Sequence, residues 1–116
     1  MKRTFLFSKI HLACVTAAKV DYEGSITIDK ELMRAAGIAP YEKVLVANTA
    51  NGNRFETYAI TGGPGEIMLN GATAFLGKPG DRVIIFAFCQ LDPGEQSAHK
   101  PVKVFVDGEN RITRIE

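Results

Sequence analysis

The sequence lacks the charge and the apolar segments that several common classes of protein need. Its net charge is only +1, from 14 basic and 13 acidic residues, so it offers no electrostatic surface for nucleic acid or an anionic membrane. No apolar run approaches the ~18 residues that a membrane span requires, and the start, MKRTFLFSKI, has neither a long apolar core nor a small-residue cleavage site. We therefore expect a cytoplasmic protein with neither a nucleic-acid partner nor a membrane partner.

Patterns for binding metals and nucleotides are also missing. The only two cysteines, Cys14 and Cys89, are far apart, and neither belongs to a C-x-x-C pair or has a histidine at ligand spacing. Both lie in apolar, strand-like runs, which favours buried free thiols over a disulfide. There is no histidine pair, carboxylate cluster or glycine-rich phosphate motif, so the sequence predicts no metal site and no nucleotide site.

What is present is the composition of one globular domain rich in strands. The chain has 116 residues, of which 46% are hydrophobic, enough for a core without disulfides. Alternating and β-branched patterns predict strands at 9–16, 24–28, 43–48, 53–60, 67–70 and 82–91, and two more within 102–115 around a DGEN turn. The unbroken apolar run at 82–91 predicts a strand that is buried on both faces.

Short helices and turns separate these strands. Asp29 is a plausible N-cap for a helix through 31–36 that stops at Gly37, and Asn51-Gly52 is a strong hairpin signal. Asn70 could cap a helical turn at 71–77, and 92–100 reads as a polar loop. A mainly β fold follows, and a small closed barrel is favoured because closure removes the exposed sheet edges that so short a chain has little else to cover.

One dipeptide within the stretch VDYEGSITID, residues 20–29, is unexpected in a strand. Gly24 weakens a strand, so on composition alone Gly24-Ser25 is an ordinary bulge or turn. A serine can also attack the carbonyl of the residue before it and turn the amide into an ester, and glycine on the acyl side leaves that carbonyl open. Elimination of the ester and hydrolysis would then leave a pyruvoyl group at Ser25.

Several separated motifs favour the second interpretation, in which the Ser25 hydroxyl attacks the Gly24 carbonyl. SKIH at 8–11, YEGSITID at 22–29, NGNRFETYAI at 51–60, NGATA at 70–74 and PGDRVIIFAF at 79–88 together resemble the pyruvoyl-dependent aspartate α-decarboxylase family, over nearly the whole chain. The resemblance implies a closed six-stranded double-psi β-barrel in a homotetramer with active sites between subunits. It also implies conversion of L-aspartate to β-alanine and CO2 for pantothenate biosynthesis.

The same resemblance implies how the enzyme is made. A zymogen of a single domain, 1–116, cleaves itself between Gly24 and Ser25 into fragments 1–24 and 25–116. The larger fragment then begins with a covalently bound pyruvoyl group derived from Ser25, which forms a Schiff base with the substrate and takes the place of pyridoxal phosphate or a metal.

Site residues are carried over from the family by position. Tyr58 matches the proton donor, Thr57 a threonine against the Gly24 carbonyl, and Arg54 and Lys9 two cations for the substrate carboxylates. The substrate loop matches Asn70, Gly71, Ala72 and Thr73, and Tyr22 and His11 match supporting residues. Thr57 and Tyr58 are consecutive and should face opposite sides of a strand, which an inter-subunit site would reconcile.

Other interpretations of these residues remain. From the residues alone, Tyr58 could be a half-buried strand tyrosine, and Lys9 or Arg54 an exposed strand charge. The stretch 25–46 also resembles the swapped-hairpin DNA-binding domains of bacterial transition-state regulators, although Asp29 and Glu31 offset the charges of Lys30 and Arg34. A third alternative is a ligand-binding barrel that never processes itself.

Overall fold

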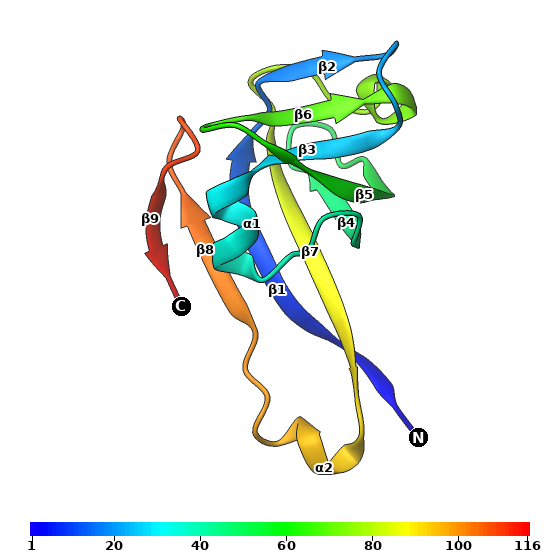
Figure 1. Cartoon of the computed structure of the whole chain (residues 1–116), viewed down its shortest axis with the longest axis vertical. Helices are drawn as coiled ribbons and strands as arrows, with labels where there is room; N and C mark the ends of the chain where they lie inside the picture. The colour runs from blue at the N-terminus through cyan, green and yellow to red at the C-terminus, as the bar shows by residue number, and fades with distance from the viewer.

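Nine strands and three short helical segments make up the computed structural model, which describes residues 1–116 (Figure 1). The strands are β1 (Arg3–Cys14), β2 (Ala17–Lys19), β3 (Ser25–Asp29), β4 (Lys43–Asn48), β5 (Arg54–Gly62), β6 (Ile67–Asn70), β7 (Arg82–Leu91), β8 (Val102–Val106) and β9 (Ile112–Ile115). The helices are α1 (Lys30–Ala36), α2 (Pro93–Gln96) and a 3₁₀ turn, η1 (Gly71–Phe75). The mainly β class is therefore confirmed.

All nine strands belong to one mixed sheet in the order β2-β6-β3-β5-β4-β7-β1-β8-β9. Strand β3 pairs parallel to β5 and antiparallel to β6, and β1 pairs antiparallel to β7 and parallel to β8. Strands β2 and β9 stand at the two ends of this order, so strand pairing does not close the sheet into a ring.

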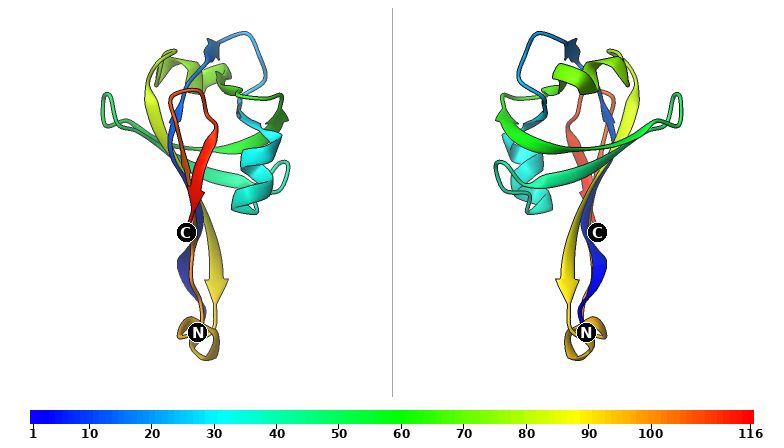
Figure 2. Two further views of the ribbon diagram at one scale, coloured as in Figure 1. Left: turned by 90° about the vertical axis from the view of Figure 1, so that its left-hand side faces the viewer. Right: turned by 90° about the vertical axis from the view of Figure 1, so that its right-hand side faces the viewer.

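Two long strands give the molecule its elongated shape. Strands β1 and β7 pair from Arg3 opposite Leu91 to Cys14 opposite Arg82, and their outer ends project away from the other strands as an arm with α2 at its tip (Figures 1 and 2). The opposite end of the molecule holds β2, β3, β5, β6 and η1 (Figure 1). This second group of elements carries the Gly24-Ser25 step.

The hydrophobic core lies beneath that group and runs into the start of the arm. It is built from side chains of strands β1, β3–β8 and helix α1, with Ile26, Ile28 and Leu69 among those that are at most 1% exposed. All five residues of β3 are buried, because β5 and β6 flank the strand and α1 follows it directly. The short strand thus starts and ends on buried polar residues, Ser25 and Asp29.

Most of the local predictions are confirmed. Strands β4, β6 and β7 have the predicted bounds, and the strands on both sides of the DGEN turn are present. The Asp29 side chain caps α1 by accepting a hydrogen bond from the Glu31 backbone N–H at 2.8 Å. Gly37 ends the helix with φ of 69°, a left-handed conformation that costs glycine little.

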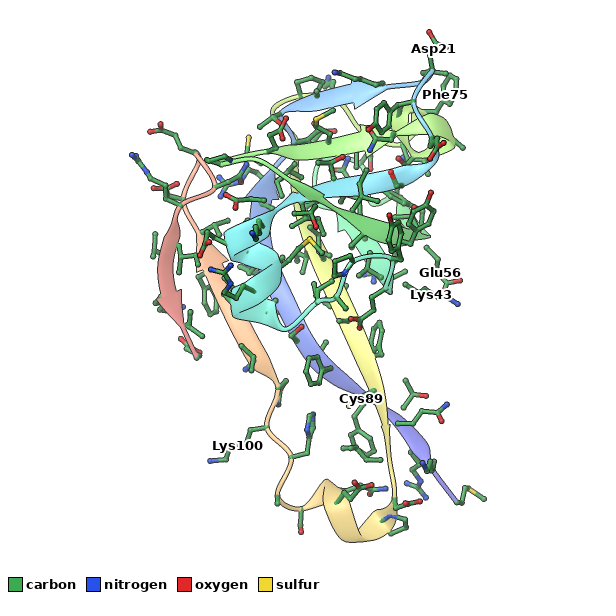
Figure 3. The ribbon with its side chains drawn as sticks, viewed as in Figure 1. Asp21, Lys43, Glu56, Phe75, Cys89 and Lys100 are labelled. Atoms are coloured by element: carbon green, nitrogen blue, oxygen red, sulfur yellow. The ribbon has the colours of Figure 1, made fainter.

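Other local predictions are wrong in informative ways. The strand predicted at 9–16 begins at Arg3 and ends at Cys14, β2 was not predicted, and α2 interrupts the predicted loop at 92–100. Strand β7 alternates between buried and half-buried residues only over 82–87, where one face is fully covered, and no residue is buried in its outer part, 88–91. Both cysteines are free, as predicted, but they are half-buried rather than buried, and Cys89 lies on the arm formed by β1 and β7 (Figure 3). The strand containing the Gly-Ser step begins at Ser25, which leaves Gly24 outside it, so no bulge is needed.

Candidate active site around Ser25

The Ser25 hydroxyl is enclosed within the protein at the Gly24-Ser25 step. Ser25 is 0% exposed, and the antiparallel register of β3 with β6 sets it directly opposite Asn70. Its Oγ donates a hydrogen bond to the Glu23 carbonyl oxygen at 3.2 Å and accepts one from Asn70 Nδ2 at 3.0 Å. The hydroxyl is therefore held from two sides, one residue away from the carbonyl of Gly24.

Asn70 plays a different part from the one its position suggested. The prediction that its side chain caps the helical turn is wrong, because the side chain makes no hydrogen bond to η1. Instead Nδ2 donates to Ser25 Oγ and also to Thr27 Oγ1, at 2.9 Å. The other amide atom, Oδ1, is buried and has no partner. A buried acceptor without a partner is costly and does nothing to orient the side chain. The orientation of the Asn70 amide therefore depends on the two hydroxyl groups to which its N–H groups donate.

Thr73 holds the same corner from η1. Its hydroxyl lies 2.8 Å from the Asn70 carbonyl oxygen and 3.3 Å from the Ser25 carbonyl oxygen, within donating reach of both. Thr73 is 7% exposed and Ala72, its neighbour in the turn, is exposed. The carbonyl group of Ser25 is thus tied to the turn that follows β6.

Gly71 brings that turn against the Gly24-Ser25 step. Its φ is 64°, and a Cβ atom added to it would lie 2.6 Å from Gly24 Cα and 3.2 Å from the Tyr22 carbonyl oxygen. Gly24 has no such crowding, since a Cβ atom there would meet nothing within 4 Å. It is therefore Gly71 that must be glycine for the two segments to come together.

A cavity of about 330 Å³ opens beside Ser25. It lies over the edge where β3 runs parallel to β5, with Ile26 opposite Ala59, so Tyr58 reaches the site from the neighbouring strand. The ring of Tyr41 lies 6.4 Å from that of Tyr58. The volume is in the range of small-molecule sites, and its lining residues are Tyr22, Glu23, Ser25, Pro40, Tyr41, Tyr58, Ile60 and Thr61.

Two of the predicted site residues lie on another part of the sheet. Lys9 and His11 are on β1, and three strands, β5, β4 and β7, stand between β3 and β1 in the sheet order. The Lys9 ammonium is 3.3 Å from His11 Nδ1, near enough to donate a hydrogen bond to it. Burial lowers the pKa of His11 from its ordinary value of 6.5, and the charges of Lys9, Arg114 and Arg82 lower it further.

The remaining two predicted residues share β5 with Tyr58 but do not reach the cavity. Arg54 is exposed at the start of the strand, and four residues of β-strand, about 13 Å, separate it from Tyr58. Thr57 pairs with Val44, points away from the side that Tyr58 takes, and lines a neighbouring hollow rather than the Ser25 cavity. No hydrogen bond joins Thr57 to Gly24 within this chain.

Sequence reasoning missed several residues of the site. Glu23, Tyr41, Thr61 and Thr27 were not among the predicted residues, yet the first three line the cavity and Thr27 binds Asn70. A signal existed only for Thr27, which follows Ser25 by two residues and so shares its face of the strand. The structure contains no cluster of three or more His, Cys, Asp or Glu side chains that could hold a metal ion. None of its helices is both long and apolar enough to cross a membrane.

Comparison with known proteins identifies the family. The family model for aspartate decarboxylase matches residues 1–113, which include the stretch that suggested a DNA-binding hairpin. The chain is 56% identical over 115 residues to the aspartate 1-decarboxylase of Legionella pneumophila strain Lens, covering 97% of this chain and 86% of the relative. It is 58% identical over 112 residues to that of Caldicellulosiruptor bescii, covering 95% and 88%. The resemblance found in the sequence is confirmed: the chain belongs to the aspartate decarboxylase family.

Proposed function

We propose that this chain is an aspartate 1-decarboxylase that matures by cutting its own backbone between Gly24 and Ser25. The reaction removes the α-carboxylate of L-aspartate as CO2 and leaves β-alanine, a precursor of pantothenate; a cytoplasmic location belongs to the same proposal. The observation that carries it is the buried Ser25 hydroxyl, held between Asn70 Nδ2 and the Glu23 carbonyl in a chain of this family.

The surroundings of Ser25 fit a pyruvoyl group at this position. Gly71 leaves the space in which the Gly24-Ser25 backbone lies, and the Asn70 amide faces the atoms that would change. The Asn70 Oδ1 atom is buried and accepts no hydrogen bond in the uncleaved chain. When formed, the pyruvoyl group supplies a ketone that binds the substrate amine and accepts the electron pair released with CO2.

Residues of the cavity would then act on the substrate. Tyr58 lines the same cavity as Ser25, and its phenol is a suitable acid for returning a proton to the substrate carbon. Gly71, Ala72 and Thr73 do not line this cavity, but η1 lies against Ser25, and their backbone N–H groups would bind a substrate carboxylate. Tyr22 closes the side of the cavity near Gly24.

The cavity of one chain lacks the cations that a dicarboxylate needs. No lysine, arginine or histidine is among its lining residues, whereas Lys9, His11 and Arg54 lie elsewhere in the chain. Since two carboxylates without a cation would bind poorly, these side chains, with Thr57, are supplied by a second copy. A homotetramer with sites between subunits satisfies this need.

Ser25→Ala provides the direct test. The wild-type protein should run on a denaturing gel as fragments 1–24 and 25–116, and mass spectrometry should find a pyruvoyl terminus on the larger fragment. Ser25→Ala should stay full-length and folded, with a cooperative thermal unfolding transition, and should form no β-alanine from aspartate. Activity in an uncleaved wild-type chain, or in Ser25→Ala, would overturn the proposal.

A further inference from the structure

The hydroxyl of Thr27, two residues after Ser25 on β3, has no part in the proposed function. Thr27 is 6% exposed, and its Oγ1 accepts a hydrogen bond from Asn70 Nδ2 at 2.9 Å, while the other N–H of the same amide reaches Ser25 Oγ at 3.0 Å. We propose that Thr27 is a positioning residue for self-cleavage: it holds the Asn70 amide so that this amide donates to Ser25 Oγ. The inference rests on the proposed self-processing.

The amide needs such a partner because nothing holds its other end. Asn70 Oδ1 is buried without a hydrogen bond, so the orientation of the side chain depends on its two N–H contacts. Without the Thr27 oxygen, one N–H as well as Oδ1 would be buried and unpaired. A half-turn of the amide would then present Oδ1 to the Ser25 hydroxyl, and the donor to Ser25 Oγ would be lost.

The packing around Thr27 fixes where its hydroxyl points. A Cβ atom on Gly62, in the neighbouring strand β5, would lie 2.5 Å from the Thr27 methyl carbon, so that methyl group occupies the space left by a missing side chain. Threonine is stiff about χ1 because it is branched at Cβ. Seating the methyl group beside Gly62 therefore directs the hydroxyl toward Asn70.

The steps of self-cleavage indicate where the hydrogen bond from Asn70 to Ser25 Oγ acts. In the first step Ser25 Oγ bonds to the Gly24 carbonyl carbon, the Gly24–Ser25 C–N bond breaks, and the hydroxyl proton passes to the Ser25 nitrogen. In the second step the Ser25 Cα proton leaves to solvent, the Cβ–Oγ bond breaks, and its electron pair stays on Oγ as part of the Gly24 carboxylate. Water then replaces the nitrogen of the resulting dehydroalanine as ammonia, which leaves the ketone.

A donor to Oγ has opposite effects on these two steps. It draws electron density from the oxygen, so it does not help Oγ to attack, but it stabilises the negative charge that Oγ gains as it leaves. The Asn70 contact therefore favours elimination. If Thr27 holds that contact, loss of its hydroxyl should slow elimination and let the ester accumulate.

Thr27→Val and Thr27→Ser form the test pair. The first keeps the branched shape and removes the hydroxyl, and the second keeps the hydroxyl and removes the methyl group. Cleavage of each freshly purified precursor is followed by mass spectrometry, with and without neutral hydroxylamine, which cuts an ester to give a hydroxamate on Gly24 and an unmodified serine at residue 25. These masses differ from those of cuts at the two Asn-Gly pairs, 51–52 and 70–71.

We expect Thr27→Ser to mature faster than Thr27→Val, because its hydroxyl can still accept the Asn70 bond although no methyl group fixes its direction. Thr27→Val should mature at least about tenfold more slowly than the wild type, because donors to a developing anion have effects of this size or larger. Hydroxylamine should release fragment 1–24 from Thr27→Val but not from Ser25→Ala. Wild-type maturation in Thr27→Val, or slow maturation with no hydroxylamine-sensitive ester, would overturn the inference. Should Thr27→Val fail to fold, Thr27→Ala carries the same expectations. A wild-type chain that never cleaves would instead overturn the proposed function.

Discussion

Gly71 and Gly24 touch across the site: a Cβ atom on Gly71 would stand 2.6 Å from Gly24 Cα and 2.9 Å from its nitrogen. The contact brings the turn after β6 against the segment just before β3. Of the two glycines, only Gly71 has a positive φ, and only Gly71 lacks room for a side chain. The backbone that carries the Gly24-Ser25 bond is therefore shaped by a residue distant in the sequence.

Alanine at these two positions should have unequal effects on folding. In the uncleavable Ser25→Ala background, we expect Gly71→Ala to lower the free energy of unfolding by about 1–3 kcal/mol, because alanine pays for both the left-handed conformation and the collision with Gly24. Gly24→Ala in the same background is the matched control and should unfold like its parent, since its Cβ atom meets open space. Urea unfolding of the three proteins gives the comparison, and equal losses at the two positions would contradict it.

Helix ends and tight turns, which depend on a few neighbouring residues, could be predicted from the sequence. Helix α1 begins after Asp29 and ends at Gly37, as predicted, because a cap and a left-handed stop depend on the local chain alone. The hairpin between β4 and β5 forms at Asn51-Gly52 for the same reason, with Gly52 at φ of 77°.

The pairing of strands that are distant in the sequence could not be predicted in this way. Asn70 looked like a helix cap because asparagine favours that role before a turn. Only the register of β6 with β3 sets it opposite Ser25. There its amide N–H groups donate to the hydroxyls of Ser25 and Thr27, and the side chain does not cap the turn. The resemblance to the family supplied Lys9, Arg54 and Thr57, but no pattern in the sequence could say that they lie away from the Ser25 cavity of their own chain.

The Asp81 carboxylate should make stability depend on pH in the acid range. It is 7% exposed and accepts hydrogen bonds from Asn48 Nδ2 at 2.9 Å and from the Lys78 backbone N–H at 3.0 Å. The Asn48 bond, more than any other contact, lowers the pKa of Asp81 below its ordinary value of 3.8, although burial acts in the opposite direction. Because the folded state holds this proton more weakly than the unfolded state, the stabilisation is full above the ordinary pKa and is lost as pH falls through the lower, folded value.

Asp81→Asn should therefore have two effects. At pH 7 it should lower the free energy of unfolding by about 1 kcal/mol, because hydrogen bonds to a charged acceptor are replaced by bonds to a neutral one. Below about pH 4 the difference from the wild type should shrink, since the wild-type carboxyl is then also becoming neutral. Urea unfolding measured from pH 7 to about pH 3 tests this, and a difference that stays constant over the whole range would contradict the assignment.

Mixing inactive variants can decide whether each active site draws residues from two chains. Three strands stand between β3 and the strand that carries Lys9, and Tyr58 lines the Ser25 cavity of its own chain. If Lys9 reaches the cavity of a neighbour, a site assembled from one Lys9→Ala chain and one Tyr58→Phe chain can contain both native side chains. Each variant alone should mature normally but form little β-alanine, since a cation or the proton donor is missing from every one of its sites.

Co-expression of the two variants should then restore up to about a quarter of the wild-type rate, because random assembly gives that share of sites with both native residues. The matched control mixes Tyr58→Phe with Ser25→Ala. Those two residues line one cavity of one chain, so no combination of such chains holds an intact site, and the mixture should stay as inactive as its parents. No recovery in the Lys9→Ala and Tyr58→Phe mixture would mean that Lys9 does not act across a subunit boundary. Recovery in the control would mean that Ser25 and Tyr58 of one active site come from different chains, which would contradict the arrangement seen in the cavity.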